Sequence, residues 1–231
     1  MSNGLEITLT DQQIEEFEIT LTKTKDLEDE IGTLSKPSKM PGHGWSTPAK
    51  NCITGSKLAK IANSICSICY ARKGRYVFKN VAKALAKRLK AWQTVDNWHL
   101  KIAELIKRKQ KSGFFRWDDS GDIQSVKHLR DIVLVAELLP QINFWLPTRE
   151  YSFVSEYKKQ FGSFPKNLCV RLSAFMINGK PPVAVAKRLG LPTSGVVEKG
   201  FNCPAPKQQN KCGDCRACWD NKVENINYNK H

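Results

Sequence analysis

Four short apolar runs decide the fold of this chain: GFFRW (residues 113–117), INFWL (142–146), LCVRL (168–172) and SGVVE (194–198). Their starts lie 29, 26 and 26 residues apart, and each has the length and composition of a buried strand. Apolar residues at helical spacing occupy the three segments between them, at residues 126–139, 150–160 and 182–189. This alternation of strand and helix predicts a mainly parallel sheet covered by helices.

The length of the chain limits how far such a sheet can close. A closed eight-stranded barrel usually needs about 250 residues, and this chain has 231. We therefore predict an α/β fold in the form of a partial or compact β/α barrel, with an open doubly wound sheet as the alternative. Two more helices are predicted before the first strand, over residues 79–93 and 98–106, with Asp96 as the N-cap of the second.

The N-terminal part of the chain differs in charge from the rest. Residues 1–35 hold nine acids and two bases, whereas residues 36–231 hold 35 bases and 13 acids. We predict an irregular acidic extension over residues 1–35 and one basic domain over residues 36–231. Local patterns predict two short strands at residues 5–9 and 17–21, or one hairpin. They also predict a solvent-facing acidic run at 26–30 and an irregular connection at 35–48.

The sequence has no feature of a membrane or secreted protein. No apolar stretch approaches the roughly 20 residues that span a bilayer, and the N-terminus lacks the pattern of a signal peptide. We therefore expect a cytoplasmic protein with no membrane partner. Its eight cysteines favour metal binding or redox work over disulfides, because reducing compartments keep thiols free.

The strongest chemical signal is KCGDCRACW at residues 211–219, where three cysteines follow one another at three-residue steps. Such spacing is typical of ligands to a cuboidal iron–sulfur cluster. We predict a 4Fe-4S cluster that draws thiolates from both ends of the chain; the alternative is zinc, held by two Cys-x2-Cys pairs. Which four cysteines bind, and whether one iron stays open, is not decided by the sequence. The candidate metal ligands are Cys52, Cys66, Cys69, Cys203, Cys212, Cys215 and Cys218, whereas Cys169 is expected in the core.

Polar side chains follow the predicted strands where each strand ends. In parallel β/α folds these carboxyl ends meet on one side and carry the functional groups. The candidate catalytic residues are Asp118, Asp119, Asp122 and Arg149. The candidate cofactor-binding residues are Arg116, Arg171 and Ser173, and side-chain alternation puts Arg116 with Asp118 on one face and Arg171 with Ser173 on one face. The alternative is that Arg116, Asp118 and Arg171 only form buried ion pairs.

Several longer motifs resemble a known family: SKMPGHGWSTPAKNCITGSKLAKI, CSICYARKGRYVF, FRWDDSGDIQSVKHL, FWLPTRE and KCGDCRACWD. Together, from about Ser35 to His231, they resemble the bacteriophage family known as the gene product 88 domain. The resemblance implies a phage-encoded protein with an iron–sulfur cluster, held by the seven cysteines named above, that acts in the cytoplasm of the infected bacterium. The resemblance does not indicate which activity the protein has. The family phrase has His where this chain has Asp118, so a proton-transfer role of that His does not carry over.

Two classes of function remain open from the sequence. The first is an enzyme with a redox or S-adenosylmethionine-type reaction on an unknown small molecule, although the Cys-x3-Cys-x2-Cys motif of radical enzymes is absent. The second is a nucleic-acid-binding or regulatory protein with a structural metal site, or an iron or redox sensor. Residues 72–111 support nucleic-acid binding because they hold thirteen bases and two acids, although a solvated helix face explains them equally well. The substrate and the oligomeric state are not decided.

Overall fold

The computed structural model of the chain describes residues 18–230, in which six strands form a single sheet. Every neighbouring pair of strands is parallel, and the strands follow one another across the sheet in chain order. The strands are β1 (Gly44–Trp45), β2 (Phe114–Trp117), β3 (Asn143–Thr148), β4 (Leu168–Ser173), β5 (Thr193–Val197) and β6 (Asn225–Asn229). β1 and β6 form the two edges, so the sheet is open and corresponds to a partial β/α barrel.

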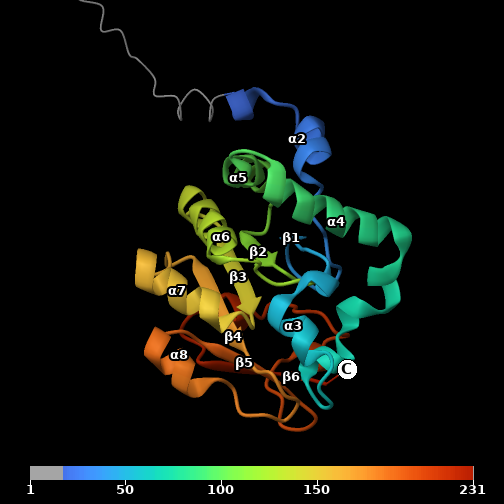
Figure 1. Cartoon of the computed structure of the whole chain (residues 1–231), viewed down its shortest axis with the longest axis vertical. Helices are drawn as coiled ribbons and strands as arrows, with labels where there is room; N and C mark the ends of the chain where they lie inside the picture. Colours follow the sequence, from blue (N-terminus) through green and yellow to red (C-terminus); the bar gives the residue numbers. More distant parts are fainter. Residues whose placement is uncertain (1–17, 231) are drawn as a thin grey trace, which may run out of the picture.

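Helices connect the strands and cover one face of the sheet. Figure 1 shows α6, α7 and α8 stacked along one side of the strands, as expected for right-handed β-α-β connections. The long helices are α4 (Lys79–Thr94), α5 (Trp98–Lys109), α6 (Val126–Leu138), α7 (Tyr151–Phe161) and α8 (Val183–Leu189). The helices and inner strands predicted from periodicity are therefore confirmed. The prediction that Asp96 is the N-cap of α5 is wrong, because the N-cap residue is Asn97, which has a φ of +50°.

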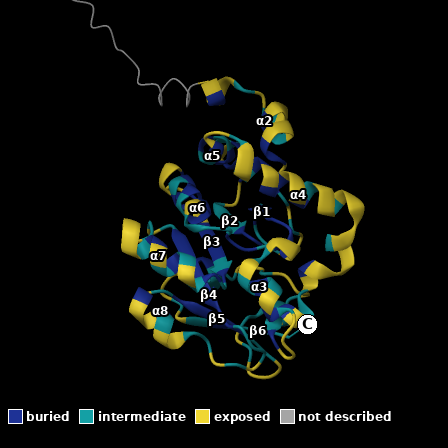
Figure 2. Cartoon of the chain, viewed as in Figure 1, coloured by how far each residue is buried: buried dark blue, intermediate teal, exposed yellow. Residues whose placement is uncertain are grey.

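Alternation along the strands separates the two faces of the sheet. Phe115, Trp117 and Phe144 are fully buried among the apolar side chains of α5, α6 and α7. Burial of each such side chain contributes about 1.5–3 kcal/mol, and Figure 2 shows the buried strands between helices with exposed outer faces. The intervening residues, such as Arg116 and Trp145, point to the opposite face.

The C-terminal segment covers this opposite face. It contains the short 3-10 helices η5 (Ala205–Lys207) and η6 (Ala217–Trp219) and ends in β6. The Trp219 ring packs edge-on against Trp145, with 5.3 Å between centroids, and its Nε1 donates to the Phe115 carbonyl at 2.8 Å. The sheet is thus sandwiched between helices and a cysteine-rich segment.

The segments before β2 also carry shorter helices. Two α-helices, α2 (Thr24–Ile31) and α3 (Ile53–Leu58), lie on either side of β1 in the sequence. The 3-10 helices are η1 (Ala49–Asn51), η2 (Ile65–Ile68), η3 (Tyr70–Arg72) and η4 (Gly74–Val77). Among the described residues no helix is long and apolar enough to cross a bilayer.

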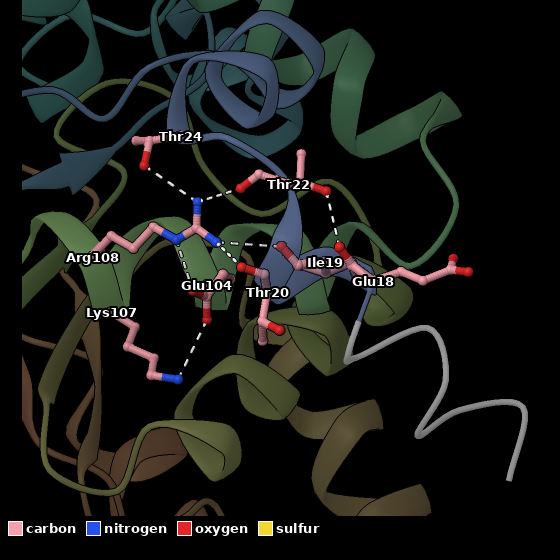
Figure 3. A network of polar contacts seen from close by, with 8 residues as sticks. All are labelled: Glu18, Ile19, Thr20, Thr22, Thr24, Glu104, Lys107 and Arg108. Carbon is pink, nitrogen blue, oxygen red and sulfur yellow. Dashed lines mark hydrogen bonds and ion pairs between the residues drawn. The ribbon is translucent and has the colours of Figure 1, made fainter. Parts of the chain in front are cut away.

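The N-terminal predictions are partly wrong. Residues 18–21 are helical rather than extended. The acidic run lies in α2, where Asp26, Asp29 and Glu30 are exposed as predicted, while Leu27 and Ile31 are buried and pack this helix on α5. Figure 3 shows the reason: the Arg108 guanidinium donates to the carbonyls of residues 19, 20 and 22 and ties this segment to α5. The strand predicted at residues 5–9 lies outside the described residues.

Candidate metal centre

The seven candidate cysteines lie in two groups. All eight cysteines of the chain are free thiols, and the eighth, Cys169, is buried in β4 as expected. We call the first group the trio; it consists of Cys52, Cys66 and Cys69. We call the second group the quartet; it consists of Cys203, Cys212, Cys215 and Cys218.

The trio is built around α3 and η2. Cys52 directly precedes α3, Cys66 lies in η2, and the Cys69 amide donates to the Cys66 carbonyl at 3.3 Å. Gly55 lies between two of the thiols, because a Cβ atom there would be 3.6 Å from the Cys52 sulfur and 3.5 Å from the Cys66 sulfur. The same Cβ would be 2.9 Å from the Cys52 Cβ, so a larger residue at this position would push the cysteine away.

Glu150 fixes the trio to the end of β3. Its two carboxylate oxygens accept from the Thr54 amide at 2.7 Å and the Thr54 hydroxyl at 2.6 Å. Ser64 caps η2 by accepting from the Ser67 amide at 3.0 Å, and donates to the Leu58 carbonyl at 2.5 Å. Sequence reasoning missed Glu150, although a carboxylate directly after a strand end was a usable signal.

Two carboxylates lie beside the trio. Asp122 accepts from the Thr148 hydroxyl at 2.6 Å, the Arg149 amide at 2.9 Å and the Ile123 amide at 2.9 Å. Burial raises its pKa to about 6, against the effect of these hydrogen bonds. Asp118 is 5% exposed, and neither of its carboxylate oxygens has a hydrogen-bond partner within the described part of the chain. Burial, and then the charge of Asp122, raise the pKa of Asp118 well above its usual value.

These carboxylates and the trio influence one another. Burial raises the pKa of the Cys52 thiol, and the charges of Asp122 and Asp118 raise it further. Burial also raises the pKa of the Cys66 thiol, whereas the charge of Arg149 lowers it. Three of the four predicted catalytic residues therefore lie close enough to Cys52 or Cys66 for their charges to act on these thiols.

The quartet lies on the segment that covers the open face of the sheet. The Cys215 amide donates to the Cys212 carbonyl at 3.0 Å, which folds the Cys-x2-Cys turn. The Cys218 sulfur lies 3.3 Å from the Tyr228 hydroxyl. Burial raises the pKa of the Cys218 thiol to about 12. The charge of Cys203 contributes to the raised pKa of Cys212 and of Cys218, so this cysteine belongs with the three-step run.

One protein family matches nearly all of the described chain. The family model for Gene product 88 matches residues 19–221, which include both groups of cysteines. The chain belongs to the gene product 88 family. The resemblance inferred from the motifs is thereby confirmed. No curated protein and no solved structure matches the chain.

Arg171 of this gene product 88 chain holds the C-terminal segment in place. It is fully buried, and its guanidinium donates to four carbonyls at 2.9–3.1 Å. The acceptors belong to Thr193, Ala217, Asp220 and Val223. A cofactor-binding role for Arg171 stays a prediction, as does one for Ser173, whose hydroxyl lies 3.1 Å from that of Ser194.

Arg116 lies on the same side of the sheet as the quartet. Its guanidinium lies 4.3 Å from the centroid of Trp145, and its charge lowers the pKa of Cys212 and Cys218. Its charge, together with that of Cys69, also acts on the neighbouring Tyr70. The alternative of buried ion pairs is wrong, because no salt bridge within residues 18–230 includes Arg116, Asp118 or Arg171.

Asp119 of the gene product 88 chain accepts hydrogen bonds that hold two of the 3-10 helices in place. Its carboxylate accepts from the hydroxyls of Ser46 and Tyr76, the latter at 2.6 Å. Its backbone carbonyl accepts from the Tyr70 hydroxyl at 2.5 Å. These bonds hold η3 and η4 over the end of β2, so the carboxylate of Asp119 is occupied in a way that the carboxylate of Asp118 is not.

The described donor side chains do not form a site for a single metal ion. Among residues 18–230, no three His, Cys, Asp or Glu side chains are grouped so that they could hold one metal ion. Zinc bonds of about 2.3 Å require sulfurs about 3.8 Å apart. Thiolates of a cuboidal cluster bind separate iron atoms, so they surround a common volume rather than a common point. The four partly buried thiols of the quartet lie on one segment, residues 203–218.

Proposed function

We propose that this gene product 88 protein is an iron–sulfur protein and that the quartet holds a 4Fe-4S cluster on the open face of the partial β/α barrel. The observation that carries the proposal is the gathering of four free, partly buried thiols from residues 203–218 onto one face of the sheet. Such a cluster, when bound, supplies one-electron transfer at a potential set by its surroundings.

The surrounding residues suit this role. The Tyr228 hydroxyl is within hydrogen-bond distance of the Cys218 sulfur, and hydrogen bonds to cluster sulfurs tune the reduction potential. The charges of Arg116 and Arg171 favour the thiolate form of Cys218, the form that binds metal. Trp219 and Trp145 pack between this segment and the sheet and keep water out.

The position of the carboxylates favours an enzymatic role of the redox or S-adenosylmethionine type. Asp118, Asp122 and Arg149 lie at the carboxyl ends of β2 and β3, where parallel β/α folds bind substrates. The protein would act in the cytoplasm of the host bacterium, where reducing conditions keep the thiols free.

The test is metal and sulfide analysis of the full chain purified without oxygen. Brown protein that contains iron and acid-labile sulfide is expected, with the absorbance and electron paramagnetic resonance of a 4Fe-4S cluster after reduction. Cys212→Ala is expected to lose the quartet signal, whereas Cys169→Ala, a matched change in β4, keeps it. Colourless protein with stoichiometric zinc would refute the proposal and favour a structural metal in a nucleic-acid-binding or regulatory protein.

A further inference from the structure

A long part of the chain before β2 contains bases but no acid. Residues 31–95 hold thirteen Lys and Arg residues and no Asp or Glu. We propose that the exposed side of α4, together with residues 72–78 that lead into it, binds single-stranded nucleic acid. We call this surface the basic face. The inference does not depend on the proposed cluster, because the basic face contains no cysteine.

The lysines of α4 form a single stripe along the helix. They are exposed and follow one another at steps of four, four and three residues: Lys79, Lys83, Lys87 and Lys90. At about 100° per residue, these steps keep the four side chains within about 80° of arc and spread them over about 17 Å of helix. The opposite side of α4 is buried, so the stripe points to solvent, and Figure 2 shows the exposed outer side of this helix.

The stripe has no acidic partner, whereas the neighbouring helix does. All four Lys and Arg residues of α5 form salt bridges, with Glu28, Glu30 or Glu104. No salt bridge within residues 18–230 includes a lysine of the stripe. Lys87 donates to a backbone carbonyl, that of Glu28, at 3.1 Å, which leaves its charge uncompensated. Like charges at this spacing repel one another and destabilise the helix, and an anionic partner would remove that repulsion.

The remaining base of α4 shows that the stripe is not needed for the fold. Arg88 is buried, and its Nε donates to the Thr33 carbonyl at 2.8 Å. This arginine therefore packs the helix against the segment after α2, while the lysines contribute no such contact. The four lysine charges are available to bind phosphates.

An exposed aromatic ring lies at the start of the stripe. Phe78 is the N-cap residue of α4 and is 58% exposed, as is Val77 before it. Sites for single-stranded nucleic acid combine such rings with bases, because a base stacks on the ring while the phosphates contact the cations. The bases of a duplex are already stacked on both faces, so Phe78 favours a single strand.

The bases before α4 extend the basic face to a cavity. Arg75 lies in η4, which packs on both η3 and α4. Arg72 and Lys73 line a cavity of about 410 Å³ together with Lys60, and no acid is among its described lining residues. A hollow lined by one sign of charge focuses the electric field, so it attracts a phosphate more strongly than a flat surface does.

The test measures binding of the full chain to fluorescent oligothymidine by fluorescence anisotropy at several salt concentrations. The probe has about 20 nucleotides, more than the roughly 4–16 nucleotides of a typical single-strand site. One variant combines Lys79→Gln, Lys83→Gln and Lys90→Gln. Each phosphate contact contributes about 0.7 to the slope of log affinity against log salt, so this slope is expected to fall by about 2. Two decades of affinity between 1 M and 0.1 M salt correspond to binding about 100-fold weaker at 0.1 M.

The matched control removes three exposed bases from α7 and α8, which Figure 1 shows away from α4. It combines Lys159→Gln, Lys187→Gln and Arg188→Gln, and it has the same net charge as the first variant. Its affinity and its slope are expected to equal those of the wild type. Equal losses in the two variants would overturn the basic face, because net charge alone would then explain the binding.

A second variant tests the stacking ring. Phe78→Ala is expected to bind oligothymidine about 5- to 150-fold more weakly with an unchanged salt slope, because it removes stacking but no charge. Phe161→Ala, a change of a 48% exposed ring at the end of α7, is the control and should bind as the wild type does. Tighter binding to a duplex of the same length, with no effect of Phe78→Ala, would overturn the preference for single strands. Binding to phosphatidylglycerol vesicles but not to oligothymidine would assign the basic face to a membrane surface and overturn the proposal.

The melting temperature shows that a loss of binding does not come from unfolding. The variant without three lysines of the stripe is expected to melt no lower than the wild type, because it loses repulsion and no described hydrogen bond. Wild-type protein that binds none of the probes at 0.05 M salt would overturn this inference and leave the proposed cluster untouched.

Discussion

Arg171→Lys tests whether the arginine is a scaffold for the quartet. The guanidinium donates to four carbonyls in two parts of the chain, β5 and residues 217–223, which a single lysine nitrogen cannot all reach. Loss of two or three of these bonds, at about 1.5 kcal/mol each, lowers the free energy of unfolding by about 3–4.5 kcal/mol. For a chain of this size the melting temperature is expected to fall by roughly 6–18 °C.

The assay combines urea unfolding with amide hydrogen exchange. Residues 217–223, which provide three of the four acceptors, are expected to exchange faster in Arg171→Lys. Arg188→Lys, on the exposed face of α8, is the matched control, with an expected change within about 0.5 kcal/mol. An unchanged unfolding midpoint and unchanged exchange at residues 217–223 would refute the scaffold role. A loss of cluster affinity alone would then favour the cofactor-binding role predicted from the sequence.

Three further substitutions test the surroundings of the trio and the core. Glu150→Ala removes two hydrogen bonds from a charged group and is expected to cost about 3–5 kcal/mol in urea unfolding; an unchanged midpoint would contradict this anchoring of α3. His128 is fully buried, and burial lowers its pKa to about 3. In the unfolded chain the same residue binds a proton near pH 6.5, so the free energy of unfolding should fall by at most about 5 kcal/mol as the pH drops from 6.5 towards 3. The fall should be less steep in His128→Phe, and equal slopes in the two proteins would contradict the lowered pKa of His128. Gly121→Ala puts a Cβ 1.9 Å from the Thr47 hydroxyl at φ +89°, so its melting temperature should fall further than that of Gly162→Ala, which has a similar φ of +84° but open space.

The inner strands and their helices could be predicted because their signals are local. Phe115 and Trp117 alternate with polar or cationic neighbours at the period of a strand, and the helix between β2 and β3 shows its apolar period within one segment. β6 could not be predicted, because NINYN is rich in Asn and buries only Ile226. Its extended form depends on pairing with β5, which residues 193–197 provide from a distant part of the sequence.

The sequence by itself determined the parallel α/β layout and the residue types available to bind a metal. Only the tertiary structure decided that the thiols lie in two groups, that Arg171 binds backbone carbonyls and that the Asp118 carboxylate accepts no hydrogen bond from residues 18–230. The physical reason is range. Periodicity and strand alternation act over a few residues, whereas the partners of a buried charge are set by packing between segments as much as a hundred residues apart.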